Sequence, residues 1–178
     1  IITPYLEAVI SFLKSHNHRL TVCDLGCGDF NIGKHLTRHT KTYIAIDIVE
    51  HLIDRNKALF KDDNLEFQCL DIASDKLPVA DCIILRQVLQ HLSNAEIENI
   101  VKKLINYTYI VLTEHLPTGT FIPNRDIISG QGIRLKQGSG VDLLEAPFNL
   151  SITAEQKIDD VVLPNNKGRI VTCIYKCQ

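Results

Sequence analysis

The stretch from Thr21 to Gly33, T-V-C-D-L-G-C-G-D-F-N-I-G, constrains the fold of this chain more than any other part. It predicts a short buried strand that stops at Gly26 and a helix that begins at Asn31. In α/β proteins a strand, a glycine turn and a helix start bring backbone N–H groups close to a nucleotide-like ligand. Gly26 and Gly28 can adopt positive φ and have no Cβ to obstruct that ligand. The stretch therefore predicts a ligand site at the end of the first strand.

The glycine spacing and the charges beside the turn indicate which ligand fits. The next glycine after G-x-G is Gly33, so the pattern is neither the dinucleotide G-x-G-x-x-G nor a G-K-[ST] phosphate loop. Asp24 and Asp29 flank the turn, with no Lys or Arg in the stretch. Two carboxylates would repel a pyrophosphate but suit a ligand with positive charge there, as S-adenosylmethionine has in its sulfonium and ammonium. A tight turn without a ligand is the alternative interpretation.

Composition favours one ordinary soluble domain over residues 1–178, since 45% of the residues are hydrophobic and 22% are charged. A net charge of −2 predicts no nucleic-acid partner. No apolar run reaches membrane-spanning length and nothing at the N-terminus resembles a signal peptide, so we expect a cytoplasmic protein without a membrane partner. The C-x-x-x-C spacing at Cys23/Cys27 and Cys173/Cys177 is not a zinc spacing, so no metal site is predicted. The oligomeric state is left open.

Hydrophobic periodicity predicts strands that alternate with helices. Helices are expected over residues 4–14, 31–38, 49–60 and 93–104, and strands over 20–25, 42–47, 64–70, 81–85, 107–113, 151–162 and 169–175. Leu116 to Gly140 is rich in Gly, Pro, Asn and Ser and is expected to run over the surface. Pro164 to Gly168 is a turn that makes the last two strands antiparallel. The alternation predicts a parallel α/β sheet with right-handed crossovers.

Polar residues end several of these apolar strands. Ligands in such sheets bind outside the carboxyl ends of the strands. Asp47 ends the second strand about 20 residues after the glycine turn, where a carboxylate holds a ribose diol. Asp71 and Ile72 follow the third strand, where they can bind an adenine amino group and cover its ring. A solvated cap explains any one of these residues, whereas a ligand site explains the set.

These motifs together resemble those of class I S-adenosylmethionine-dependent methyltransferases, from the glycine motif to the final hairpin. V-C-D-L-G-C-G resembles the family's glycine motif, A-I-D-I its acidic position after the second strand, and C-L-D-I its adenine-side position. I-L-R-Q-V-L-Q-H-L-S resembles the segment after the fourth strand in many small-molecule methyltransferases. The resemblance implies a three-layer, Rossmann-like α/β fold with a seven-stranded, mostly parallel sheet. The implied strand order is 3-2-1-4-5-7-6, with an antiparallel last strand.

The resemblance also implies which residues bind the cofactor, S-adenosylmethionine. Its candidate residues are Asp24, Gly26, Gly28, Asp47, Ile48, Asp71, Ile72 and Arg86. Arg86 is a departure, because many relatives carry an acid there. A cation beside the sulfonium is unfavourable, so Arg86 is expected to point towards the acceptor or an acidic partner. No N-P-P-Y-like sequence follows the fourth strand, which argues against amide and adenine N-methylation.

The implied activity is methyl transfer to an unidentified small-molecule acceptor. The alternatives are a non-catalytic cofactor- or partner-binding module and, less favoured, a nicotinamide-dependent oxidoreductase. Candidate acceptor-binding residues are Gln87, Glu114 and Arg134, and His91 and His115 are candidate general bases. Positioning without a base is a further possibility. The glycine-rich segment Gly130 to Pro147 is interpreted as a lid for an anionic or polar acceptor, or as a solvated loop.

Overall fold

The fold is built on one seven-stranded sheet. The structure is a computed structural model that describes residues 1–177. Its elements are α1 (Ile2–Ser15), β1 (Thr21–Leu25), β2 (Thr42–Asp47), α2 (Glu50–Leu59), β3 (Leu65–Cys69), β4 (Cys82–Arg86), α3 (Asn94–Leu104), β5 (Tyr109–Leu116), β6 (Ala154–Val162) and β7 (Arg169–Lys176). The strand order is β3-β2-β1-β4-β5-β7-β6, and β7 runs antiparallel to both β5 and β6. The predicted fold class, strand order and hairpin are confirmed.

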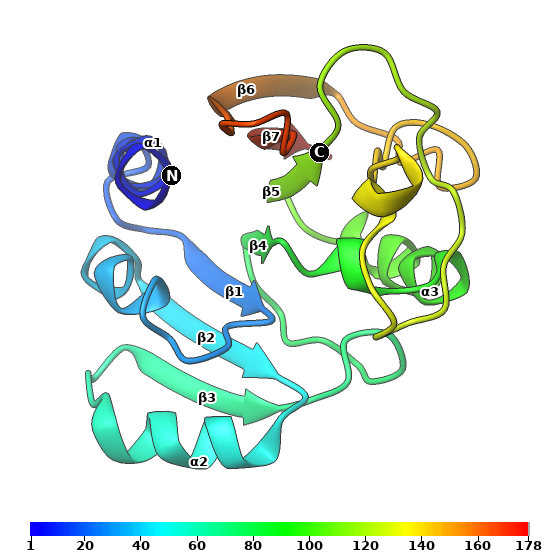
Figure 1. The fold of residues 1–178 in the computed structure, drawn as a ribbon. Coiled ribbons are helices and arrows are strands. Elements are labelled where there is room, and N and C mark those ends of the chain that lie inside the picture. The colour runs from blue at the N-terminus through cyan, green and yellow to red at the C-terminus, as the bar shows by residue number, and fades with distance from the viewer. Residues whose placement is uncertain (178) are drawn as a thin grey trace.

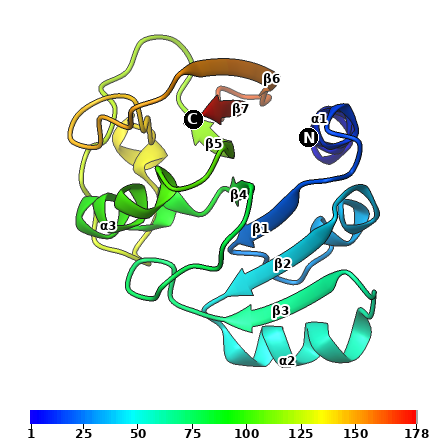
Figure 2. The ribbon, with the colours of Figure 1, turned by 180° about the vertical axis from the view of Figure 1, so that it is seen from behind.

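Two layers of other elements cover the sheet. α1 lies on one side and α3, with the long segment after β5, lies on the other (Figures 1 and 2). β1 pairs in parallel with β2 and β4, and four of its five residues are buried, so it forms the middle of the sheet. From β1 the chain first adds β2 and β3 on one side and then β4 and β5 on the other, so the strand order changes direction between β1 and β4. In α/β sheets, ligands bind at the carboxyl ends of the strands at such a point.

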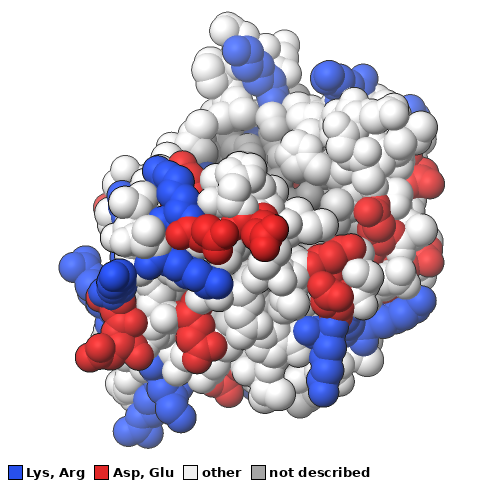
Figure 3. All heavy atoms as spheres, turned by 90° about the horizontal axis from the view of Figure 1, so that it is seen from below, with Lys and Arg blue, Asp and Glu red and all other residues white. Residues whose placement is uncertain are grey.

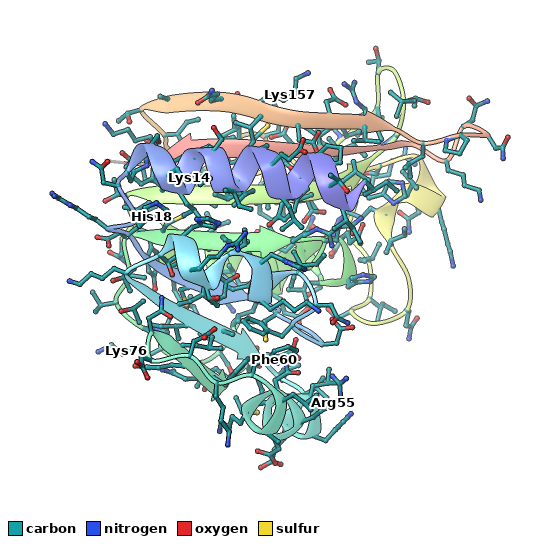
Figure 4. The ribbon with its side chains drawn as sticks, turned by 90° about the vertical axis from the view of Figure 1, so that its left-hand side faces the viewer. Lys14, His18, Arg55, Phe60, Lys76 and Lys157 are labelled. Atoms are coloured by element: carbon teal, nitrogen blue, oxygen red, sulfur yellow. The ribbon has the colours of Figure 1, made fainter. Side chains whose placement is uncertain are left out.

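The two long helices bury narrow apolar stripes. In α1, Tyr5, Val9 and Leu13 recur every four residues and are buried. In Figure 4 this helix lies in front of the sheet and runs along its strands. α3 begins at the predicted capping box, in which the Ser93 hydroxyl accepts from the Glu96 N–H and the Glu96 carboxylate accepts from the Ser93 N–H. These local signals explain how both helices pack and why α3 begins where the sequence predicts, whereas α1 begins at Ile2, two residues before the predicted start.

The predicted helix over residues 31–38 is wrong. The segment forms two short 3₁₀ turns, Gly33–His35 and Thr37–His39. Phe30, at φ 62°, buries its ring in an aromatic cluster, with its centroid 4.8 Å from that of Phe67. A Cβ on Gly33 would lie 2.4 Å from that ring. The backbone at Gly33 therefore lies very close to the Phe30 ring, and this packing replaces a regular helix. Tertiary packing here overrides the local pattern.

The segment between β5 and β6 is more buried than the predicted surface excursion. β5 ends at Leu116 rather than residue 113, so Glu114 and His115 lie within the strand. Val141, Leu143 and Phe148 join the core on the α3 side. The side chain of Asn124, which is 6% exposed, donates to the carbonyls of Asp142 and Ala146. The segment is therefore an anchored part of the domain.

The surface shows no dominant sign of charge on the face drawn in Figure 3, where basic and acidic side chains are interspersed. Among residues 1–177, no helix combines the length and the apolar character that a membrane crossing requires.

Candidate functional site

A cavity of about 330 Å³ opens at the carboxyl ends of β1 to β4. The loops after these four strands supply its walls. They include Gly26, Asp47, Ile48, Asp71, Ile72, Arg86, Gln87, Val88, His91, Leu92 and Glu96. Six of the eight predicted cofactor residues thus line one cavity, together with Gln87 and His91 from the segment after β4.

The glycine turn forms one wall of this cavity. Gly26 has φ 86°, and a Cβ there would lie 2.4 Å from Cγ2 of Val88. Gly28 has φ 54°, and no heavy atom lies within 4 Å of the position of a Cβ. Gly26 is therefore needed for packing, whereas Gly28 leaves open space for a ligand. The Asn56 side chain of α2 donates to the Gly28 carbonyl at 2.8 Å and holds the turn in place.

Asp47 is held rigidly at the end of β2. Its Oδ2 accepts from the Gly28 N–H at 2.9 Å, and its Oδ1 accepts from the Val49 N–H at 3.0 Å. Each carboxylate oxygen keeps a further lone pair for a ligand hydroxyl. The adjacent Ile48 side chain is 65% exposed, which leaves an apolar surface beside the carboxylate. An acid next to an exposed apolar side chain suits a ribose that carries a flat ring.

Asp71 is similarly oriented after β3. The Ala73 N–H donates to its Oδ1 at 2.9 Å and the Ser74 hydroxyl donates to its Oδ2 at 2.9 Å. The Ala73 hydrogen bond, followed by the weaker influences of Ser74 and Lys103, lowers the pKa of this carboxyl. Asp71 therefore stays an acceptor at neutral pH, next to the buried Ile72.

A second, small chamber of about 60 Å³ adjoins the glycine turn on the α1 side. It is lined by Tyr5, Asp24, Gly26, Tyr43 and Arg86, among others, and shares Gly26 and Arg86 with the larger cavity. Burial raises the pKa of Asp24 to about 6, although the Tyr43 hydroxyl donates to its Oδ2 at 2.8 Å. Among the described residues, the Tyr5 hydroxyl and Arg86 Nε have no hydrogen-bond partner. A carboxylate, a guanidinium and an unpaired hydroxyl together suit a zwitterionic group.

Arg86 lies beside both α1 and an acidic side chain. Its guanidinium carbon lies 5.1 Å from the centroid of the Tyr5 ring. Arg86 lines the small chamber together with Asp24, and its charge lowers the pKa of Asp24, although burial has the larger, opposite effect. Of the two expected directions, the acidic partner is thus found in Asp24, and an orientation towards the acceptor stays a prediction.

Gln87 and His91 occupy the turn after β4. Gln87 has φ 57°, unusual for a residue with a side chain, and its N–H donates to the Thr113 carbonyl at 2.8 Å. His91 is exposed at the cavity, and its Nε2 lies 3.3 Å from the Gln90 side-chain nitrogen. Of the two predicted bases, only His91 lines the cofactor cavity.

His115 and Arg134 lie away from this cavity. His115 Nε2 lies 2.6 Å from the Lys167 carbonyl, in the turn between β6 and β7, and donates to it. Arg134 is fully buried, and its guanidinium donates to Leu89 O, Arg125 O and Asn94 Oδ1. Its hydrogen bonds thus go to the protein, which differs from the expectation that it meets an acceptor. They also anchor the segment that was interpreted as a lid.

Glu114 is buried within β5, near Arg134 and the Leu89 N–H, and only 3% of its surface is exposed. Neither of its carboxylate oxygens has a hydrogen-bond partner among the described residues. Burial raises the pKa of Glu114 to about 8, although Arg134 and the Leu89 N–H lower it; the latter lies close but misses hydrogen-bond geometry. Glu114 is thus largely neutral at pH 7.

This raised pKa predicts a pH dependence of stability. Between the ordinary pKa of a glutamate and about 8, the folded state binds more protons than the unfolded state, so stability falls as pH rises. We expect the urea midpoint of the parent to decrease from pH 5 to pH 8, and Glu114→Gln to remove most of that decrease. Glu145→Gln, at an exposed position, is the control. Parallel pH profiles for parent and Glu114→Gln would contradict the prediction.

Tyr5 and Asn56 are site residues that the sequence did not reveal. Tyr5 belongs to the apolar stripe of α1, and its hydroxyl faces the chamber only because α1 packs over the ends of β1 and β4. Asn56 lies in α2 and binds a carbonyl 28 residues earlier in the chain. The sequence signal for either residue is a polar group on an otherwise apolar helix face. This pattern is common at solvated positions, so it does not identify a site residue.

Comparisons with known proteins agree with this geometry. Residues 22–108 match the family model described as a methyltransferase domain. A phosphoethanolamine N-methyltransferase from Triticum aestivum is 27% identical over 106 residues, which are 56% of this chain and 20% of that relative. The chain therefore spans about a fifth of the length of this curated relative.

Solved structures share the fold. N-methyltransferase NodS from Bradyrhizobium japonicum WM9, in complex with S-adenosyl-L-homocysteine, has a TM-score of 0.68 at 12% identity and covers 96% of this chain and 85% of its own. The N-terminal domain of EvdMO1, solved in the presence of S-adenosylhomocysteine and D-fucose, has a TM-score of 0.69 at 13% identity and covers 98% and 83%.

The residues of the two adjoining cavities fit S-adenosylmethionine. The carboxylates of Asp47 and Asp71 and the unpaired polar atoms of Tyr5 and Arg86 suit its ribose, adenine and amino-acid parts, and the open space at the Cβ position of Gly28 adds room at the glycine turn. With this site at the reversal point of a 3-2-1-4-5-7-6 sheet, the chain has the fold of the class I, Rossmann-like S-adenosylmethionine-dependent methyltransferases, and its residues 22–108 match the methyltransferase-domain family.

Proposed function

We propose that this protein transfers a methyl group from S-adenosylmethionine to a small-molecule acceptor. One observation carries the proposal: a single cavity is lined both by Asp47 and Asp71, which follow β2 and β3, and by Gln87 and His91, which follow β4. The two carboxylates suit the nucleoside of the cofactor. The residues after β4 are where an acceptor could meet the cofactor.

In this proposal the protein contributes orientation, exclusion of water and proton transfer. When bound, S-adenosylmethionine supplies an activated methyl group on a sulfonium, which is a good leaving group. Asp47 would hold the ribose hydroxyls, Asp71 and Ile72 the adenine, and Asp24 with Arg86 the ammonium and carboxylate of the amino-acid part. Alignment accounts for most of what such a site must do. His91 would accept a proton from an acceptor that carries one.

Calorimetric titration of the protein with S-adenosylmethionine and with NAD tests the cofactor. We expect heat of binding with the former only, because carboxylates at the glycine turn disfavour a pyrophosphate. Tighter binding of NAD would overturn the proposal. A second assay detects S-adenosylhomocysteine in the presence of small amines and alcohols. Phosphoethanolamine belongs in this panel, because the relative from Triticum aestivum is named for it. Cofactor binding without any product would favour the non-catalytic module.

The Asp47→Ala variant tests the ribose contact. We expect its affinity for S-adenosylmethionine to fall by about 1.5–3 kcal/mol, the range for a hydrogen bond to a charged group. Asp29→Ala is the matched control, since Asp29 is exposed near the same turn but lines neither cavity. Titration calorimetry and circular dichroism of both variants separate loss of binding from loss of fold. Unchanged affinity in Asp47→Ala would mean that the ribose lies elsewhere.

A further inference from the structure

We propose that a separate cavity on the α3 side of β5 and β7 binds a small amine with an apolar body, and that this amine is the methyl acceptor. The cavity has a volume of about 500 Å³ and lies between β5, β6, β7 and the segment that follows β5. Figure 1 shows this segment looping away from the sheet before it returns to β6. Among the described residues, the cavity shares no lining residue with the cofactor cavity. The acceptor role rests on the proposed function, whereas amine binding does not.

Glu114 is the observation that points to a ligand. It lines this cavity, is 3% exposed, and has no hydrogen-bond partner for either carboxylate oxygen among the described residues. A buried carboxyl without a partner destabilises a protein, and such groups persist mainly where function uses them. The charge of the Arg134 guanidinium lowers the pKa of Glu114, but Arg134 donates its hydrogen bonds to carbonyl and amide oxygens, so the Glu114 oxygens are left without its donors. A ligand ammonium would supply the donors that Glu114 lacks.

The basic residues of the cavity are already paired. Lys157, on the edge strand β6 (Figure 4), donates to Asp160 Oδ2 at 2.9 Å. Arg169 of β7 donates to the same carboxylate, with Nε 2.9 Å from Oδ1. The two cations thus share one carboxylate, and their side chains are 55% and 34% exposed, whereas the buried carboxyl of the lining is that of Glu114. Solvent screens the two cations, so they favour an anion less than the buried acid favours a cation.

The remaining charged residues of the lining are acidic. Glu155 of β6 and Asp142 add to the burial that raises the pKa of Tyr175, so their negative charge is felt inside the cavity. Burial and Glu155 also raise the pKa of Cys173 to about 11, against smaller lowering effects of Tyr175 and Lys157. The rest of the wall is largely apolar, with Leu112, Leu116, Phe121, Leu144 and Val171. A negative field within an apolar wall selects a cation attached to an apolar body.

The position of Glu114 connects this cavity with the methyl-transfer site. Arg86, at the end of β4, pairs with Thr113 of β5, and the Gln87 N–H donates to the Thr113 carbonyl. Glu114 follows Thr113 in β5, so it lies one residue beyond the pairing partner of Arg86. An amine anchored there would lie next to the turn after β4 that lines the cofactor cavity. To accept a methyl group, its ammonium would first give a proton to His91, the proposed base. The freed nitrogen lone pair would then form the new N–C bond while the S–C bond breaks and its electron pair leaves with the sulfur of S-adenosylhomocysteine.

Binding is tested with phenethylamine and its neutral counterpart, phenethyl alcohol, on the cofactor-free protein. We expect calorimetry to show binding of the amine and at least tenfold weaker binding of the alcohol. Glu114→Gln keeps size and polarity but cannot become the carboxylate that an ammonium would stabilise, so it should weaken amine binding by about 10-fold or more, as expected for a hydrogen bond to a charged group. Glu145→Gln, outside the cavity, is the matched control and should bind like the parent.

The location is tested by fluorescence. The chain contains no tryptophan, so Phe121→Trp places a single indole in the wall of the cavity. Its emission should shift as phenethylamine is added, with the same midpoint as the calorimetric titration. An unchanged spectrum while binding heat is observed would mean that the amine binds elsewhere and would overturn the proposal.

Other outcomes are equally decisive. Undetectable amine binding at millimolar concentration, equal binding of amine and alcohol, or unchanged amine affinity in Glu114→Gln would each overturn the inference. Failure of the proposed function is recognised separately, by the absence of S-adenosylmethionine binding to the parent protein. Amine binding to a protein that binds the cofactor but does not methylate phenethylamine or related amines would overturn the acceptor role.

Discussion

Replacement of Arg134 by alanine is expected to lower the free energy of unfolding by about 3–5 kcal/mol, the scale for breaking a buried charged network. The variant would leave Leu89 O, Arg125 O and Asn94 Oδ1 without their donor and would open a cavity in a fully buried position. For a chain of this size, each kcal/mol lowers Tm by roughly 2–4 °C, so a loss of about 6–20 °C is expected. Urea and thermal unfolding measure both quantities.

Arg55→Ala is the control for this variant. Arg55 lies on the exposed side of α2 (Figure 4), so its replacement should change stability by less than about 0.5 kcal/mol. If Arg134→Ala were as stable as Arg55→Ala, Arg134 would not anchor the segment after β5. Its earlier interpretation as an acceptor-binding residue on a lid would then be favoured again.

Replacement of His91 by alanine is expected to lower turnover by about 10²–10⁴-fold if His91 is the general base. The expectation rests on its position, since His91 lines the cofactor cavity and is exposed to solvent. The affinity of the His91→Ala variant for S-adenosylmethionine should remain nearly unchanged, because the predicted nucleoside contacts come from other loops. Turnover with the best acceptor from the panel is measured against pH, together with calorimetric titration of the cofactor.

His115→Ala separates a proton-transfer role from a general effect of removing a histidine. His115 donates to the Lys167 carbonyl, so its replacement should loosen the β6–β7 turn and leave turnover within a few-fold of the parent. If His91→Ala keeps the parent rate and pH profile, the reaction proceeds by positioning alone. If only His115→Ala loses turnover, the assignment of the base is reversed.

The sequence by itself determined the parts of the protein that depend on local patterns. Continuous apolar runs gave correct positions for the strands, and Ser93 with Glu96 marked the start of α3 at the observed capping box. The glycine turn and the acids at the ends of β2 and β3 could be assigned to one site, because parallel strands bring their carboxyl ends to the same sheet edge. The strand order came from the resemblance of these motifs to a known family.

Only the tertiary structure decided the roles of residues whose environment comes from distant parts of the chain. Tyr5, Asn56 and Arg134 each contact segments far away in sequence, so no local period marks them. The 3₁₀ turns after Phe30 replaced a predicted helix because ring packing outweighed a weak helical tendency. Glu114 was foreseen as a polar strand end, but its burial without a partner depends on how the segment after β5 folds over it. Burial and partner choice are properties of packing, and they decide which charged residues are structural and which remain free for a ligand.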